Sequence, residues 1–410
     1  MGGGLLDLVA KGGQDIYFVC NPEVSFFKKV YKRHTNFAIE QQKYLFDGDI
    51  NFGRTSTFTI PRQGDLLKSL FIQFELPNIN TNPTTNITKY ANYIGYSLID
   101  YIEISIGGDQ VIDRLTGEWM YINNELSYSK DKKEGYNIMV GGNSNFSNYR
   151  PINGNSKGNF IVPINFWFTK DIGLALPLVA LQYHDVNITL KLRPLKEVFV
   201  SQTGSLSDED IKITKCNISL EYIYLDSIER KLFAQNNHEY LIKQTQYNLN
   251  NHISANLSKK RIDLNFNHPV IELVFVVQRK DRFTTSANSG NDYFNYSSDS
   301  NFDNIDTIKN AQILLNNEER TPLMTAKECR YLNIINTHTS IPNNVIYVYS
   351  FSMNPESFQP SGSCNFSRFD NKELALEFVD NIAISEVKVF AVNYNILRIS
   401  KGMGGLAYIN

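Results

Sequence analysis

The chain has 410 residues, which is long for a single hydrophobic core, so two domains are expected. Its 40 basic and 42 acidic residues give a formal charge of -2, so no overall positive field would attract a nucleic-acid backbone or an anionic membrane. No run approaches the ~18 apolar residues that a membrane helix needs. Residues 1–8 lack the basic and apolar regions of a signal peptide, so conventional secretion is not expected.

The amino-terminal segment, residues 1–24, mixes Gly, short apolar residues and Pro22, and it precedes the first long strand pattern. We expect an arm here; the alternative is a strand added to the chain's own sheet. Next comes a basic run, residues 28–34, among aromatic side chains. Because the rest of the chain is neutral, an exposed strand face or a surface that contacts partner proteins is favoured over genome binding.

Apolar residues that alternate with polar ones predict most of the secondary structure as strands with one buried face. The segment 270–277 is apolar on both faces apart from Glu272, which is typical of a central strand. The alternating segments are 72–76, 102–106, 186–192 and 374–378. This pattern predicts an all-β protein.

Two pairs of segments suggest that the halves of the chain are distant copies. Residues 218–224 match residues 390–396 at an offset of 172, and residues 188–192 match residues 374–378 at an offset of 186. Between the halves, residues 226–235 predict a short helix with Asp226 as its cap. The polar stretches 129–158 and 281–300 predict surface loops.

Several stretches resemble the major capsid proteins of nucleocytoplasmic large DNA viruses, in order and spacing. Near the start stand Gly3–Ala10, Gln14–Tyr17, Phe26–Lys28 and Tyr31–Ala38; at the junction Tyr224–Asp226 and His238–Ile242; and late in the chain Asn354–Pro355, Gln359–Arg368, Asn393–Asn395 and Gly402–Tyr408. The chain departs modestly at residues 23–25, and its two long polar stretches match nothing in the family.

This resemblance implies two consecutive eight-stranded jelly rolls, and we expect an arm (1–24), a first jelly roll (25–225), a linker helix (226–235) and a second jelly roll (236–410). It implies a structural protein that forms homotrimeric, pseudo-hexagonal capsomers of an icosahedral shell. The implied partners are other copies of the chain, neighbouring capsomers, minor capsid proteins and, at the inner side, membrane proteins, with no direct contact to nucleic acid. The implied location is the virion, with assembly in the host cytoplasm.

No catalytic, metal or cofactor site is expected. Cys20, Cys216, Cys329 and Cys364 form no Cys-x-x-Cys pair, and free, mostly buried thiols are expected. The histidines lack metal-site spacing; they are His34, His184, His238, His252, His268 and His338. The acidic cluster 208–210 could bind a cation, but a solvated loop is favoured. The glycines from Gly402 to Gly405 predict a tightly turning or flexible tail rather than a phosphate loop.

Glycosylation sequons that fall in predicted loops are Asn86, Asn145 and Asn295, as weak candidates. The rival function from another class is a carbohydrate-binding or carbohydrate-active β-sandwich, which would also be rich in Tyr, Asn and loops. A capsid paralogue of low abundance is a further alternative, since it would share the fold but not the dominant role.

Overall fold

A computed structural model describes residues 2–77, 79, 88–108, 110–142, 158–201, 211–283, 291–298 and 304–409. The chain divides into two compact units, Met1–Asn36 and Phe37–Asn410. Asn86 and Asn145 of the sequons and the acidic cluster 208–210 lie outside the described residues.

The first unit is short and exposed. It contains two brief helices, α1 (Gly3–Val9) and α2 (Ile16–Val19), and every described residue from 2 to 36 is exposed. Residues 2–36 contain no strand, so neither the strand considered as an alternative to an arm nor a strand face for the basic run 28–34 is formed.

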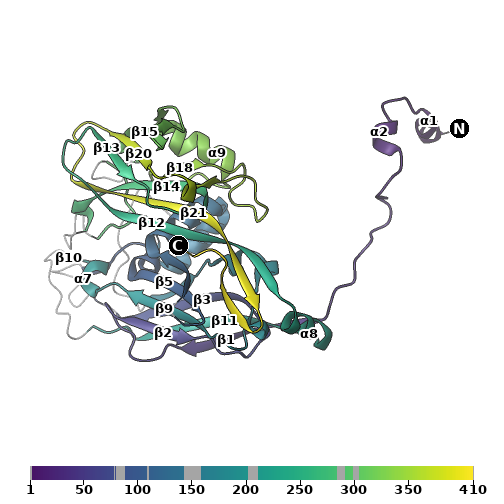
Figure 1. Ribbon diagram of the computed structural model, residues 1–410, viewed down its shortest axis with the longest axis horizontal. Helices are drawn as coiled ribbons and strands as arrows, with labels where there is room; N and C mark the ends of the chain where they lie inside the picture. The colour runs from purple at the N-terminus through teal and green to yellow at the C-terminus, as the bar shows by residue number, and fades with distance from the viewer. Residues whose placement is uncertain are drawn as a thin grey trace. The chain divides into compact units, whose positions relative to one another are not determined.

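In the second unit, residues 37–225 form a sandwich of two antiparallel sheets. One sheet has the order β1-β11-β3-β7 and the other β2-β9-β5-β6 (Figure 1). The strands are β1 (Phe37–Leu45), β2 (Thr55–Thr59), β3 (Leu66–Leu76), β5 (Ile99–Ile106), β6 (Val111–Thr116), β7 (Gly158–Pro163), β9 (Val186–Leu192) and β11 (Lys215–Leu225), with the shorter β4 (Thr88–Tyr90), β8 (Leu176–Pro177) and β10 (Phe199–Ser201).

A second sandwich, above the first in Figure 1, follows from residue 238 onward. Its sheets have the orders β12-β21-β14-β18 and β13-β20-β15-β16. The strands are β12 (His238–Ile253), β13 (Lys259–Asp263), β14 (Pro269–Arg279), β15 (Ile308–Leu315), β16 (Glu318–Glu319), β18 (Tyr347–Ser350), β20 (Lys372–Phe378) and β21 (Ser385–Ser400), with the shorter β17 (Met324–Thr325), β19 (Cys364–Asn365) and β22 (Met403–Leu406).

The two sandwiches have the same topology. When the main strands of each are numbered along the chain from one to eight, both have one sheet in the order 1-8-3-6 and the other in the order 2-7-4-5. This is the jelly-roll arrangement, in which strands distant in sequence pair. The segments matched in the sequence lie in equivalent strands, since β11 and β21 are both eighth and β9 and β20 both seventh, which confirms the internal repeat.

The strand pattern follows from burial. Strand β9 alternates buried and half-buried residues along its whole length, as an alternating sequence requires, whereas β14 is buried at every position between its two ends. Both assignments agree with the sequence. Apolar side chains of both sandwiches belong to a single cluster of buried residues, so the sandwiches share a continuous core.

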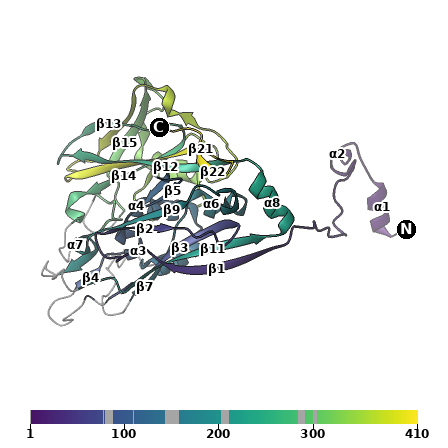
Figure 2. The same ribbon diagram turned by 60° about the horizontal axis from the view of Figure 1, so that its bottom comes forward.

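Helices fill the connections. They are α3 (Ile94–Leu98), α4 (Gly117–Ser127), α5 (Lys130–Val140), α6 (Trp167–Lys170), α7 (Leu195–Val198), α8 (Ser227–Gln235) and α9 (Asn333–Thr337), with the short turns η2 (Ile172–Leu174), η3 (Leu178–Ala180), η4 (Lys280–Arg282), η5 (Glu328–Leu332) and η6 (Phe366–Arg368). Helix α8 connects β11 to β12 (Figure 2). The Asp226 side chain accepts a hydrogen bond from the Ser227 amide, as the predicted helix cap requires.

Two loop expectations are wrong in part. Residues 130–140 form α5, which ends at Gly141 with a left-handed φ of 78°. Residues 291–297 are buried instead of exposed. Helix α4 was not expected at all, because it is apolar or buried on every side and so lacks the one-sided stripe that marks a surface helix.

At the carboxyl end, Lys401 and Gly402 have left-handed φ angles of 52° and 80°. They turn the chain so that β22 pairs back on β21. The glycine-rich tail is therefore a tight turn, as expected. Within the described residues, no helix is both long and apolar enough to span a membrane.

Candidate functional site

A cavity of about 430 Å³ lies between the two sandwiches. Both sandwiches supply its walls, and the charged side chains among them come from strands, helix ends and loops that are far apart in the sequence. Its lining includes Asp113, Trp119, Asn123, Ser127, Tyr128, Asn165, Trp167, Lys170, Asp171, Leu241, Lys243, Glu272, His338, Glu356, Phe358 and Tyr394. Ionisable groups gathered at one place between domains make this the candidate functional site.

Glu272 is the acidic centre of the site. It lies on β14, where the pairing with β21 shifts register between Val270 and Glu272. A bulge of this kind re-aims the side chains beside it, and here it accompanies a carboxylate in an otherwise apolar strand, only 7% exposed. The interruption at Glu272 was visible in the sequence, although its partner was not.

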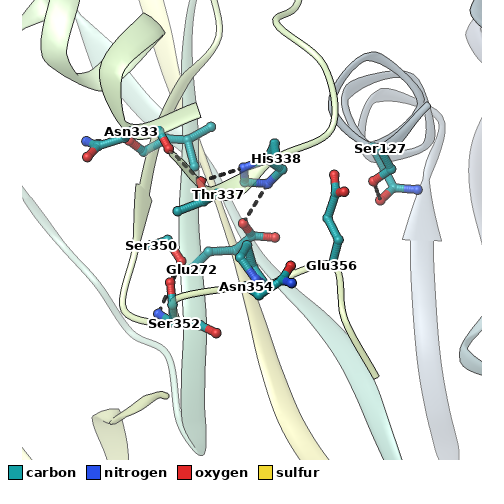
Figure 3. A network of polar contacts seen from close by, with 12 residues as sticks. Ser127, Glu272, Asn333, Thr337, His338, Ser350, Ser352, Asn354 and Glu356 are labelled. Carbon is teal, nitrogen blue, oxygen red and sulfur yellow. Dashed lines mark hydrogen bonds and ion pairs between the residues drawn. The ribbon is translucent and has the colours of Figure 1, made fainter. Parts of the chain in front are cut away.

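That partner is His338, which caps the carboxyl end of α9 (Figure 3). Its Nε2 lies 2.9 Å from Glu272 Oε2 and its Nδ1 lies 2.9 Å from Thr337 Oγ1. The Thr337 hydroxyl donates to the Asn333 carbonyl at 2.6 Å, so it accepts from Nδ1. A carboxylate can only accept, so Nε2 donates as well. A proton on each ring nitrogen corresponds to the imidazolium form of His338, which these two contacts therefore favour.

The electrostatics agree with this assignment. Burial disfavours the charge of His338, but the charge of Glu272 and the hydrogen bond to it together raise the pKa of the imidazole above its usual 6.5. Burial likewise opposes ionisation of Glu272, yet His338 and, more weakly, Lys170 and Lys243 lower the pKa of its carboxyl group. Each partner thus holds the other in its charged form.

Two lysines face the same cavity. Burial lowers the pKa of Lys243 to about 8, and the nearby charge of Lys170 adds to the effect. The Lys243 ammonium donates to the carbonyls of Pro355 at 2.6 Å and Ser357 at 2.7 Å, which ties β12 to the loop beside the cavity. Lys170 is an exposed residue, but burial of its amine in the cavity lowers the pKa of that group.

Asp113 closes the first-sandwich side of the cavity. Its Oδ1 accepts from the backbone amides of Arg114 at 3.0 Å and Thr245 at 3.2 Å, so it bridges β6 and β12. Burial raises the pKa of this carboxyl group to about 7 in spite of both hydrogen bonds. A buried acid that titrates near neutrality makes the contact between the sandwiches sensitive to pH.

The contacts from Thr337 to His338 and from His338 to Glu272 superficially resemble a catalytic triad, with Thr337 as nucleophile, His338 as base and Glu272 as acid. The resemblance fails on proton positions, because the Thr337 hydroxyl proton is engaged by Asn333 and the imidazolium has no free lone pair to accept it. Glu356 also connects two segments, because its Oε2 accepts hydrogen bonds from the Thr339 amide and hydroxyl. The arrangement can fasten segments together, and it is not set up for proton abstraction.

A charged group that is not part of the cavity lining joins the two sandwiches. Glu118, near the start of α4, lies 2.5 Å from the Lys388 ammonium on β21, and Lys388 also donates to Gln278 Oε1 at 2.6 Å. These side chains are 4%, 5% and 0% exposed, respectively. Beside them, the ring of Trp119 packs against that of Phe390 at 5.4 Å. Helix α4 therefore contributes both a polar and an aromatic contact between the two jelly rolls.

Other predicted residues lie apart from this site. Cys216 and Cys329 are buried, Cys364 is half-buried and Cys20 is exposed, all as free thiols. The Asn295 side chain, expected in a surface loop, is 2% exposed and donates to Asp292 at 3.0 Å, so that expectation of exposure is wrong. Across the described ranges, no group of three or more His, Cys, Asp and Glu side chains could hold a metal ion.

Sequence reasoning treated His338 like the other histidines and missed its pairing. Only Glu272, as a single acid within a buried strand, gave a signal. The sequence analysis did not single out the two lysines or Asp113, because separations of 57 to 130 residues hide their convergence.

The two consecutive jelly rolls define a double β-sandwich protein. A family model described as "Major capsid protein N-terminus" matches residues 25–226, and one described as "Large eukaryotic DNA virus major capsid protein" matches residues 229–405. The major capsid protein of Pyramimonas orientalis virus is 38% identical over all of both chains, and that of Paramecium bursaria Chlorella virus 1 is 33% identical over all of both chains.

Solved structures agree. A chain from the quasi-atomic model of the PBCV-1 virus capsid aligns with a TM-score of 0.79 and 29% identity, over 94% of this chain and 100% of that one. The Faustovirus major capsid protein aligns with a TM-score of 0.76 at 13% identity, over 95% and 94% of the two chains, which shows the fold. The chain belongs to the major capsid protein family of large eukaryotic DNA viruses and has that family's double jelly-roll fold.

These relatives support a structural component of the virion shell. They do not support the carbohydrate-binding alternative.

Proposed function

We propose that three copies of this chain form a pseudo-hexagonal capsomer, the repeating tile of an icosahedral shell. The observation that carries the proposal is the identical strand order of the two sandwiches. Three copies then present six similar β-sandwiches around a threefold axis. A contact between the first sandwich of one copy and the second of the next closes after three steps.

A tile of this kind needs its two sandwiches held in a fixed relation. The Glu118–Lys388 pair, the hydrogen bond from the Thr245 amide to Asp113 and the shared apolar core supply that restraint. If the two sandwiches could move as on a hinge, the angle between successive copies would vary, and a ring of three copies would close poorly. The charged groups between the sandwiches therefore support assembly without chemical turnover, and we propose that the chain is not an enzyme.

We propose the domain organisation that the sequence suggested: an arm over residues 1–24, jelly rolls over 25–225 and 236–410, and a linker over 226–235. The arm would contact neighbouring capsomers and minor capsid proteins at the inner side of the shell, next to membrane proteins, during assembly in the host cytoplasm. Nine side chains of residues 2–24 support a contact role, since they are large, apolar and at least 47% exposed.

Negative-stain microscopy and sedimentation of the purified chain test the trimer. Hexagonal particles with threefold symmetry and a mass three times 46.9 kDa are expected. A monomer retained on a glycan column would favour the carbohydrate-binding rival. Quantifying the protein in purified virions separates a dominant shell protein from a minor paralogue.

The arm has its own test. Deleting residues 1–20 is expected to leave soluble trimers and to impair the joining of trimers into shells. A truncated chain that assembles as well as the full chain would rule out the arm.

Glycosylation at Asn86, Asn145 and Asn295 is also kept as a proposal. Intact-mass measurement on virion-derived protein tests it directly. Asn295 is the weakest of the three sites, because its buried side chain could carry a glycan only before the chain folds.

A further inference from the structure

The contact between the two jelly rolls of one chain joins the fifth main strand of the first, β6, to the first main strand of the second, β12. The Gln244 side-chain amide on β12 donates to the Ile112 carbonyl on β6, and the Thr245 amide on β12 donates to Asp113 on β6. Each jelly roll also has the strand that the other one uses in this contact. These two remaining equivalents are β1, first in the first jelly roll, and β16, fifth in the second.

Strand β1 matches β12 residue by residue. The first strand pairs with β11 and the second with β21, so the offset of 172 between β11 and β21 fixes which residues of β1 and β12 are equivalent. Three of the nine positions of β1 carry the same residue as β12, and the matched pairs are Ile39 and Ile242, Gln41 and Gln244, and Tyr44 and Tyr247. The two strands are therefore equivalent in sequence as well as in topology.

The two strands differ in how well they are covered. Residues 240–248 of β12 are all buried or half-buried, whereas seven of the nine residues of β1 are exposed. Ile242 is 0% exposed, but its equivalent Ile39 is 43% exposed. Strand β1 is also an edge of its sheet. An edge strand with bare apolar side chains is a surface suited to contact with another chain.

The fifth strands show the same contrast. The offset of 186 between β9 and β20 makes Ile104 on β5 equivalent to Ile313 on β15. Asp113 pairs with Ile104, and the Arg320 amide donates to the Ile313 carbonyl at 2.9 Å, so Arg320, directly after β16, holds the position of Asp113. Asp113 is 5% exposed, whereas residues 318–320 are all exposed. The surface around β16 therefore lacks the cover that β6 has.

Charge makes the two uncovered surfaces complementary. Within the chain, Lys243 on β12 and Asp113 on β6 line the same cavity. Their equivalents are Glu40 on β1 and Arg320 beside β16, so both charges are reversed and opposite signs would again meet. Strands β1 and β15, which β16 follows in a hairpin, lie on opposite sides of the body (Figures 1 and 2). The two surfaces can therefore meet only between copies.

The segment after the fifth strand supports the same partner. In the first jelly roll this segment is α4, which is buried where it contacts the second jelly roll. In the second jelly roll it includes η5 and α9, where Tyr331, Leu332 and Ile335 are 37%, 52% and 60% exposed. These side chains add apolar area to the surface around β16, as the core of an interface between copies requires.

We propose that the β12–β6 contact recurs between copies, with β1 of one copy against β16 of the next and Glu40 of one facing Arg320 of the other. Three contacts within chains then alternate with three between chains and close a ring of six jelly rolls. The inference rests on the proposed trimer and names the surfaces through which it closes.

Charge reversal in the full-length chain tests the contact. Glu40→Arg or Arg320→Glu alone places like charges opposite each other, so the concentration at which half of the trimer dissociates should rise by about tenfold or more. The double variant Glu40→Arg/Arg320→Glu restores the attraction and should return that concentration to within about threefold of the wild type. Sedimentation measures it, and circular dichroism checks that each variant folds.

The matched control is Asp380→Arg. It makes the same change in charge as Glu40→Arg, at a side chain that is 86% exposed and lies outside β1, β16, η5 and α9. Trimer dissociation should be unchanged in this variant. If the loss in Glu40→Arg is not rescued by Arg320→Glu, then β1 faces another surface, such as residues 1–36 of its own chain, and the inference is overturned.

Disulfide trapping identifies the partner independently. Gln41 and Glu319 are equivalent to Gln244 and Ile112, which are hydrogen-bonded within the chain. Chains with Gln41→Cys are mixed during refolding with chains with Glu319→Cys, both carrying Cys20→Ser to remove an exposed thiol. Mild oxidation should give disulfide-linked dimers in the mixture and none with either chain alone. Mixed trimers that form no such link would contradict the contact.

The trimer and the contact can fail separately. A wild-type trimer that both single charge reversals leave intact overturns the inference and spares the trimer. A wild-type chain that is monomeric at every concentration refutes both.

Discussion

The two buried charged pairs differ in what they connect. The Glu118–Lys388 pair lies in a dry contact between the two jelly rolls, with side chains 5% and 6% exposed, and the ammonium also donates to Gln278. The Glu272–His338 pair lies within the second jelly roll, with side chains 10% and 2% exposed, and it borders a cavity of about 430 Å³ whose lining also includes two lysines and Asp113. Breaking a buried pair between the jelly rolls leaves an unpaired charge in the core, whereas a pair that contains a histidine can respond to pH.

The largest expected effect is at the dry pair. Glu118→Ala leaves the Lys388 ammonium buried without a counter-charge and should lower the free energy of unfolding by about 3–5 kcal/mol. Chemical denaturation measures it. Glu239→Ala, which breaks the exposed pair with Arg398, is the control and should cost under about 1 kcal/mol. Equal losses in the two variants would contradict the distinction between dry and exposed pairs.

A smaller loss is expected at the Glu272–His338 pair. His338→Gln keeps a donor but removes the charge, and it should destabilise the chain by about 2 kcal/mol near pH 6, in the range for a hydrogen bond to a charged group. Because the pKa of His338 is raised, the contribution is present below pH 6.5 and is lost as the pH rises through the folded-state value. Because the pKa of Glu272 is lowered from 4.5, the contribution is also lost in acid.

Unfolding curves of the wild type and His338→Gln between pH 3 and 10 measure this dependence. The difference between the two should be greatest near pH 5 to 6 and should shrink on both sides. A difference that stays constant with pH would show that His338 is not an imidazolium.

The position of α4 allows a third test. A Cβ at Gly117 would overlap the backbone carbonyl oxygens of Tyr96 and Ile99. Gly117→Ala should therefore destabilise the chain by about 1–3 kcal/mol, as other overpacking changes do. Gly135 in α5 has open space around its Cβ position, so Gly135→Ala should instead stabilise by about 0.5–1 kcal/mol through helix propensity. Thermal unfolding of both variants compares them, and the same sign for both would contradict this account.

The effect at Asp113 has the opposite sign. The pKa of its carboxyl group is raised to about 7, so the folded state binds a proton that the unfolded state has already lost. Stability therefore falls as the pH rises from about 4 to 7. Asp113→Asn keeps the acceptor oxygen for Arg114 and Thr245, so it should equal the wild type at pH 4 and be more stable at pH 8, by up to about 4 kcal/mol for a shift of this size. Urea midpoints at both pH values decide this.

The strands were predictable because the order of apolar and polar residues in each strand follows its pattern of burial. Residues 186–192 alternate in the sequence and in the structure, and residues 270–277 are apolar because β14 is covered on both faces. The helix after Asp226 was predictable from its cap. Helix α4 was not, since a helix buried on all sides has no polar face to set its period.

The sequence by itself determined two all-β halves, their internal repeat and the capsid family, because alternation and family motifs are local properties of the chain. Only the tertiary structure decided that Glu272 meets His338 and that Glu118 meets Lys388. Those pairs join residues 66 and 270 positions apart. Their protonation depends on burial and on neighbours brought from other strands, which no local pattern records.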